Sequence, residues 1–201
     1  MKTGIALALA LMWGGGVVAA TDHDTHSLVT WSGIAGVITA PGVDNPVAVI
    51  TDGNGHVVRQ IHSGTLPWVT RAGWASVDLI TGAARFAVTG LVLNGGNASG
   101  TAGVIDQAIG TLVCNPGSTE LNQPQSVINT QPIALSLRGD ASFSGELTYA
   151  VPFPCTNPLF LIRTGPAFGP FAGRWLATGV DRHVGDSNQS RGDRSHMYDR
   201  R

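Results

Sequence analysis

Lysine is almost absent from this 201-residue sequence, because Lys2 is its only lysine. Charged residues make up 12% of the chain, and the formal net charge is −1 at pH 7. A nearly neutral chain with few cations lacks the basic surface that binds nucleic acid or an anionic membrane. We therefore expect no nucleic-acid partner.

Long hydrophobic runs are also missing, and the longest apolar segment lies at the start of the chain. Lys2, the apolar run Gly4–Trp13 and the small residues of Val18-Ala19-Ala20 at positions −3 and −1 are typical of a signal peptide, residues 1–20, cleaved after Ala20. An uncleaved anchor is the alternative, but Gly14–Gly16 shorten the apolar stretch below the length that spans a bilayer. We expect a secreted or periplasmic protein without membrane insertion after cleavage.

Cysteine is scarce, since only Cys114 and Cys155 are present. In an exported chain, an even number of cysteines favours a disulfide, here Cys114–Cys155. The alternative is two buried free thiols. Neither cysteine belongs to a C-x-x-C pair or a histidine cluster, which disfavours a zinc site.

Sequence motifs of catalysis are lacking as well. There is no G-x-S-x-G elbow, P-loop, H-E-x-x-H or dinucleotide fingerprint. No catalytic residue and no cofactor are therefore predicted. Active sites of β folds are often assembled from distant loops, so a hydrolase using Asp78, Asp106 or His56 stays an alternative.

What the sequence does contain is a regular series of turn residues, with short runs rich in Val, Ile, Thr, Leu and Phe between them. This pattern predicts an all-β fold, a single antiparallel β-sandwich or barrel domain with one disulfide. We expect a flexible mature N-terminus over 21–26, a β domain over 27–183 and a disordered tail over 184–201. The main expected strands are 29–38, 47–51, 56–61, 76–80, 104–113, 159–163 and 174–180.

Two local patterns make finer predictions. Apolar residues alternate on both sides of Gly139-Asp140, which predicts a hairpin spanning Ile133–Tyr149. In Arg85–Asn94 apolar residues recur at every second position, and the alternation moves by one position at Gly90. This shift predicts a β-bulge at Gly90.

A family resemblance rests on several turn and strand motifs between residues 66 and 180. They are Leu66-Pro67-Trp68-Val69, Gly90-Leu91-Val92-Leu93, Gly110-Thr111-Leu112-Val113-Cys114, Ser136-Leu137-Arg138-Gly139-Asp140-Ala141, Cys155 followed by Leu161-Ile162-Arg163, and Gly173-Arg174-Trp175-Leu176-Ala177-Thr178-Gly179. In these the chain resembles an uncharacterised family of secreted bacterial all-β proteins with no assigned activity. The resemblance implies export and β structure, and it implies no catalytic residue.

Cleavage after Ala20 would create a possible metal site at the new N-terminus. The Thr21 amine, two backbone amides and the His23 imidazole can surround Cu(II) or Ni(II) in a tetragonal arrangement. The alternative is a frayed polar terminus without a role.

Arg138, Gly139 and Asp140 form an Arg-Gly-Asp triplet on the expected hairpin tip, and Arg191-Gly192-Asp193 repeats it in the tail. An exposed triplet would be a candidate adhesive site that binds a partner. The alternative for the first triplet is turn chemistry, because Gly-Asp suits a tight turn.

Four tryptophans and two histidines complete the candidates. Tryptophans in Val- and Ile-rich strands are usually core residues, although an exposed set would stack on sugars. The four tryptophans considered are Trp31, Trp68, Trp74 and Trp175. His56 and His62 flank one expected strand, where a solvated pair is the favoured interpretation.

Taken together, these features predict a non-catalytic binding or envelope-associated module with an unknown extracellular or envelope partner. A hydrolase assembled from distant loops and an N-terminal copper- or nickel-binding protein are the alternatives.

Overall fold

The computed structural model of the chain describes residues 27–40, 42–51, 56–118, 125–166 and 169–185. Within this part the only helical element is one 3-10 turn, η1 (Gly169–Phe171), and the rest is strands and loops. The all-β class is therefore confirmed. The predicted disulfide Cys114–Cys155 is also present.

Thirteen strands make up the described structure. They are β1 (Leu28–Gly36), β2 (Val47–Thr51), β3 (Val57–Ile61), β4 (Trp68–Val69), β5 (Ala72–Asp78), β6 (Ala83–Thr89), β7 (Val92–Leu93), β8 (Gln107–Cys114), β9 (Ser126–Asn129), β10 (Ile133–Ala134), β11 (Ala141–Glu146), β12 (Leu159–Thr164) and β13 (Trp175–Gly185).

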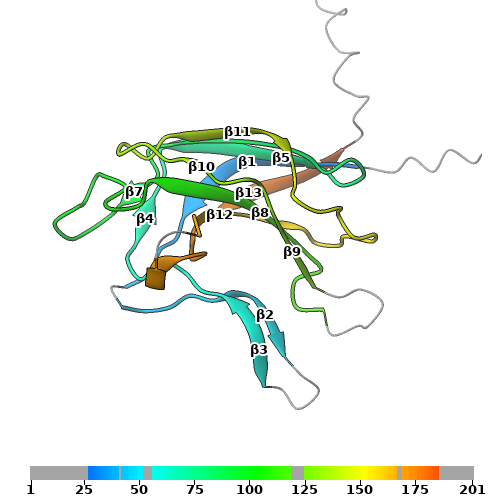
Figure 1. Cartoon of the computed structure of the whole chain (residues 1–201), viewed down its shortest axis with the longest axis horizontal. Helices are drawn as coiled ribbons and strands as arrows, with labels where there is room; N and C mark the ends of the chain where they lie inside the picture. The colour runs from blue at the N-terminus through cyan, green and yellow to red at the C-terminus, as the bar shows by residue number, and fades with distance from the viewer. Residues whose placement is uncertain (1–26, 41, 52–55, 119–124, 167–168, 186–201) are drawn as a thin grey trace, which may run out of the picture.

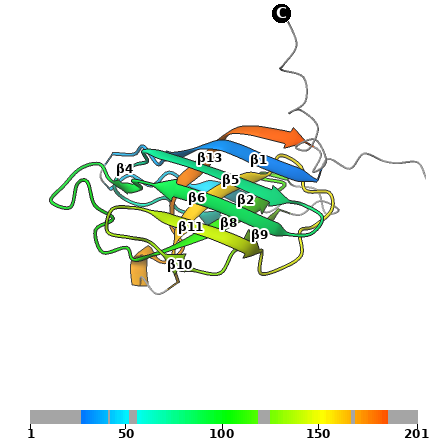
Figure 2. The ribbon, with the colours of Figure 1, turned by 90° about the horizontal axis from the view of Figure 1, so that it is seen from above.

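Nine of these strands form one antiparallel sheet that curls into a half-barrel (Figure 1). The strand order is β10-β8-β12-β13-β1-β5-β6-β11, and β9 pairs with β8 beside β10. Seen from above, the strands from β13 to β11 lie side by side along one wall (Figure 2). Small two-stranded sheets, β2-β3 and β4-β7, lie outside this order.

The first and last strands of the described chain are neighbours in the middle of this sheet. β1 pairs with β13 over most of its length, from Leu28 opposite Gly185 to Gly36 opposite Ala177. On its other side β13 pairs with β12, and β1 pairs with β5. β13 therefore joins the two halves of the sheet, and it includes Val184 and Gly185 beyond the expected domain boundary at residue 183.

Aromatic rings fill the inside of the curl. Phe160 of β12 lies 5.6 Å from Trp31 of β1 and 5.5 Å from Phe86 of β6, measured between ring centroids. Phe143 of β11 stacks on Phe86 at 5.9 Å. Because β12 pairs with neither β1 nor β6 in the sheet order, the two contacts of Phe160 join strands that share no ladder of backbone hydrogen bonds.

A glycine in β8 lets these rings approach the sheet. A Cβ atom on Gly110 would lie 2.6 Å from Cε1 of Phe86 and 3.0 Å from Cζ of Phe160, which is too close for any side chain. Gly179 of β13 plays the same part beneath Trp31, where a Cβ would lie 2.6 Å from the indole ring. The depth of the curl thus depends on two positions without a side chain.

The predicted hairpin over Ile133–Tyr149 is wrong, although its turn is present. Gly139 N–H donates to Ser136 O at 2.8 Å, but β10 pairs with β8 and β11 pairs with β6. Alternation on both sides of a turn shows that each strand has a buried face, and it does not identify the partner. Here the turn spans the gap between the two ends of the curled sheet.

The predicted bulge at Gly90 is also wrong. β6 ends at Thr89 and β7 begins at Val92, and β7 pairs with β4 in a separate sheet. Gly90 has a φ of 65°, a left-handed conformation that ends the strand instead of inserting a residue into it. The phase shift in the sequence marks the place where the chain changes sheets.

The disulfide joins two neighbouring strands at one end of the curl. Cys114 is the last residue of β8, and Cys155 lies in the segment before β12, to which β8 is paired. Asn115 extends this link, because its side-chain oxygen accepts the Thr156 N–H at 2.7 Å and its amide donates to Pro154 O at 3.1 Å.

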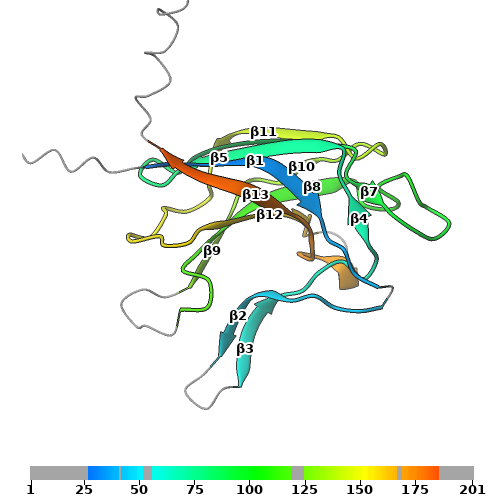
Figure 3. The same cartoon turned by 180° about the vertical axis from the view of Figure 1, so that it is seen from behind.

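The β2-β3 hairpin projects from the body on the side opposite β11 (Figure 3). Two side-chain hydrogen bonds hold it against the rest of the protein. Trp175 Nε1 donates to Asn45 O, and Gln125 Nε2 donates to Ala48 O, at 2.8 and 2.7 Å. A short parallel bridge between Ser63 and Trp175 completes the attachment.

Several predictions fall outside the described residues: the signal peptide over 1–20, the N-terminus over 21–26 and the tail from residue 186. In the part of the chain that the structure describes, no helix has the length and hydrophobicity of a bilayer-crossing segment.

Substitution of Gly110 by Ala should lower the free energy of unfolding by about 1–3 kcal/mol, because the added methyl group overpacks the Phe86–Phe160 contact. Gly185→Ala is the matched control, since a Cβ at this strand position meets no atom within 4 Å. Urea unfolding followed by tryptophan fluorescence measures both variants. Equal stability of the two would contradict the role given to Gly110.

Removing the disulfide with the double substitution Cys114→Ala and Cys155→Ala should cost up to about 4 kcal/mol, because the bond closes a loop with a sequence separation of 41 residues. Unfolding of the wild type in the presence and absence of a reductant gives an independent measurement. A change below about 1 kcal/mol in both experiments would show that pairing of β8 with β12 suffices.

Candidate functional site

A cationic pocket of about 170 Å³ lies where the β2-β3 hairpin meets the ends of β12 and β13. Gln60 and His62 come from β3 and the residue after it, Arg163 from β12, and Arg174 directly precedes β13. Pro170, Ala172 and Gly173 of the connection between β12 and β13 complete its wall.

Arg163 is the half-buried cation of this pocket. Its Nε donates to Gly173 O at 2.6 Å, and Nη1 donates to Asn129 Oδ1 at 3.3 Å. Within the described residues no carboxylate forms an ion pair with Arg163. Burial, and in second place the positive charge of Arg59, lowers the pKa of the Arg163 guanidinium, although an arginine stays protonated.

Arg174 forms the opposite side of the pocket. Its Nη1 donates to Ser63 O at 2.8 Å, and its Nε donates to Pro170 O at 3.2 Å. Both acceptors are backbone carbonyls, so these bonds fix the orientation of the guanidinium without neutralising its charge. Arg59, Arg163 and Arg174 therefore bring three positive charges to one region.

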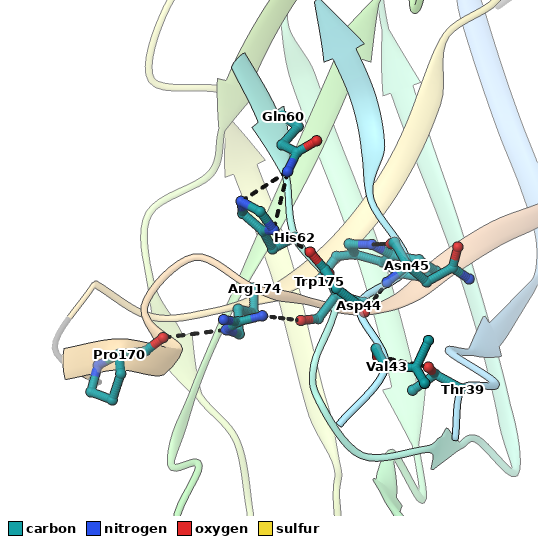
Figure 4. Close-up of polar contacts among 10 residues, drawn as sticks. Thr39, Val43, Asp44, Asn45, Gln60, His62, Pro170, Arg174 and Trp175 are labelled. Carbon is teal, nitrogen blue, oxygen red and sulfur yellow. Dashed lines mark hydrogen bonds and ion pairs between the residues drawn. The ribbon is translucent and has the colours of Figure 1, made fainter. Parts of the chain in front are cut away.

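His62 and Asp44 form an ion pair at the base of the β2-β3 hairpin, joined through His62 Nδ1 and Asp44 Oδ2 (Figure 4). The Gln60 side-chain nitrogen lies 3.2 Å from His62 Nε2. Asp44 Oδ1 also accepts the Ser63 N–H at 3.0 Å. Partial burial alone would raise the pKa of Asp44, but the hydrogen bonds from His62 and Ser63 and the charge of His62 lower it overall.

Asp44, His62 and Ser63 do not form a nucleophilic triad. The Ser63 hydroxyl is directed to the carboxylate of Asp44 at 3.3 Å and accepts the Asn45 N–H at 2.8 Å. Ser63 is also completely buried. A serine nucleophile needs a hydrogen bond to the histidine and access to substrate, and Ser63 has neither of these within the described structure.

The first Arg-Gly-Asp triplet lies in the turn between β10 and β11. Gly139 is buried, and its carbonyl accepts the Leu91 N–H at 2.9 Å. Asp140 Oδ1 accepts the Gly90 N–H at 3.0 Å, while Arg138 is exposed. These contacts give Gly139 and Asp140 a structural part in the turn, and adhesion stays a prediction. The second triplet lies outside the described residues.

The residues suggested for a hydrolase occupy separate positions. Asp78 Oδ1 accepts the N–H groups of Ile80 and Thr81 in the turn after β5. Asp106 is exposed just before β8, and His56 is exposed just before β3. None of the three lines the cationic pocket.

Three of the four candidate tryptophans are core residues, as predicted, and the fourth is partly exposed. Trp31, Trp68 and Trp175 are buried, whereas the side chain of Trp74 on β5 is 45% exposed. No sugar-stacking row of tryptophans forms among the described residues.

The predicted Cu(II) or Ni(II) site at Thr21 and His23 lies outside the described residues. Across the described ranges, no three side chains of His, Cys, Asp or Glu gather closely enough to hold a metal ion.

Sequence reasoning missed the cationic pocket because its residues lie far apart along the chain. Gln60 and His62 lie in and directly after β3, and Arg163 and Arg174 come more than 100 residues later. One signal was present: Arg163 follows Leu159-Phe160-Leu161-Ile162, and a charge at the end of a wholly apolar strand is unusual.

Comparisons with protein-family models, with curated proteins and with solved structures found no match to this chain.

The Asp44–His62 pair should make stability depend on pH at the acidic end. Because the pKa of Asp44 is lower in the folded protein than in the unfolded chain, the pair stabilises the fold above the unfolded pKa of about 3.9. That contribution is lost as the pH falls through the lower folded pKa.

Between about pH 5 and pH 2, the wild type should lose more unfolding free energy than Asp44→Asn or His62→Gln. The difference between the wild type and each variant should stay below about 1 kcal/mol, because the side chains of His62 and Asp44 are 46% and 36% exposed. Urea unfolding at a series of pH values measures it, and parallel profiles for all three proteins would contradict the assignment.

Proposed function

We propose that this protein is an extracytoplasmic, non-catalytic binding module whose cationic pocket takes a small ligand with an anionic oxygen group. The proposal combines export, which the N-terminal sequence predicts, with the geometry around Arg163 and Arg174. The disulfide is compatible with an oxidising compartment.

The observation that carries the proposal is the half-buried Arg163 guanidinium, which no carboxylate of the described residues neutralises. A partly buried charge with no opposite charge beside it is costly, and Arg59 adds repulsion from the same sign. An anion in the pocket would offset both costs at once.

The donor geometry suits oxyanions. Arg163 and Arg174 each use Nε and Nη1 for hydrogen bonds within the protein. Among the described residues, no acceptor bonds the Nη2 group of either side chain. Guanidinium N–H groups bind carboxylate, sulfate and phosphate oxygens with strong, charge-assisted hydrogen bonds. The orienting bonds also reduce the entropy that these side chains lose when a ligand binds.

The test is calorimetric titration of the mature protein with phosphate, sulfate and acetate at constant ionic strength. We expect saturable binding of at least one of these anions, weakened about tenfold or more by Arg163→Gln and by Arg174→Gln. Arg85→Gln is the matched control, because Arg85 is an exposed arginine on β6 outside the pocket. Absence of saturable binding, or equal weakening in the control, would refute the proposed function.

A further inference from the structure

An apolar cavity of about 100 Å³ adjoins the cationic pocket, and Arg174 lines both. Trp68, Leu93 and Leu176 form its buried wall. Its lining also includes apolar side chains that face solvent: Leu66 is 36% exposed, Phe171 42% and Val104 78%.

The two cavities share one wall, which the η1 turn and Arg174 build together. Neighbouring residues of η1 face different sides, since Pro170 lines the cationic pocket and Phe171 lines the apolar cavity. The Arg174 side chain is held between Pro170 O and Ser63 O and keeps a partly exposed edge. A ligand lying across this edge would reach both cavities.

We propose that the ligand of the cationic pocket is a single-chain amphiphile, with its oxyanion head at Arg163 and Arg174 and its alkyl tail in the apolar cavity. This inference rests on the proposed function and names the class of ligand. Charge complementarity places the head, because Arg163 and Arg174 both line the cationic pocket, whereas Arg174 alone reaches the apolar cavity. Burial of the exposed apolar side chains at the other cavity places the tail.

The size of the cavity limits how much tail it holds. A cavity of about 100 Å³ is small beside a long alkyl chain, so it accommodates only a short segment of the tail. Affinity should therefore rise with chain length over the first members of a series and then level off.

The experiment is calorimetric titration with n-alkyl carboxylates from acetate to heptanoate, all below their micelle-forming concentrations. Each methylene should strengthen binding about threefold to fourfold until the cavity is full. Monoalkyl sulfates and phosphates form parallel series that identify the preferred head group. The n-alkyl alcohols of equal length should bind at least tenfold more weakly than the best anionic series, because they lack the charge.

Phe171→Ala removes one wall of the apolar cavity, and should abolish the gain per methylene while leaving acetate, sulfate and phosphate binding within about twofold of the wild type. Tyr149→Ala is the matched control, because this aromatic side chain is 77% exposed and lines neither cavity. It should reproduce the wild-type series.

The two proposals fail in distinguishable ways. Binding of simple anions with no dependence on chain length, or an unchanged series in Phe171→Ala, would overturn the amphiphile and leave the anion site in place. Alcohols that bind as tightly as the anions would overturn it too. Loss of all saturable anion binding in the wild type would overturn the proposed function itself.

Discussion

The contact of Phe86 and Phe160 over Gly110 determines how far the sheet curls. The two rings come from strands that share no ladder, so only side-chain packing draws those strands together. Gly110 sets the depth of that packing, since any side chain there would push the rings away from β8. The contact holds β12 against β6 across the inside of the curl, although the two strands lie four positions apart in the sheet order.

The same curl places the candidate site. β12 packs on the inside through Phe160, and Arg163, three residues later, lines the cationic pocket. The pairing of β12 with β13 shifts register between Ile162 and Arg163, and after β12 the chain returns through η1 to Arg174. Along β12 the chain therefore passes from the aromatic core at Phe160 to the cationic pocket at Arg163.

The strands themselves were largely predictable, because alternation and turn residues are local signals. The prediction for 47–51 coincides with β2, and the one for 159–163 differs from β12 by one residue. Strand partners were not predictable at the Gly139-Asp140 turn, because periodicity records which face is buried and carries no information about the neighbour. The site was less predictable still, since His62, Arg163 and Arg174 line one pocket only because the β2-β3 hairpin packs where β12 and β13 meet their connection.

The position of β13 has a consequence for incomplete chains. A polypeptide that ends before residue 175 lacks the strand between β12 and β1, so its remaining strands fall into two sheets that no backbone ladder connects. Each of those sheets would present a long unpaired edge, the feature that promotes strand-to-strand aggregation. Completion of the nine-stranded sheet therefore requires nearly the entire domain, and both edges stay open to other strands until β13 is in place.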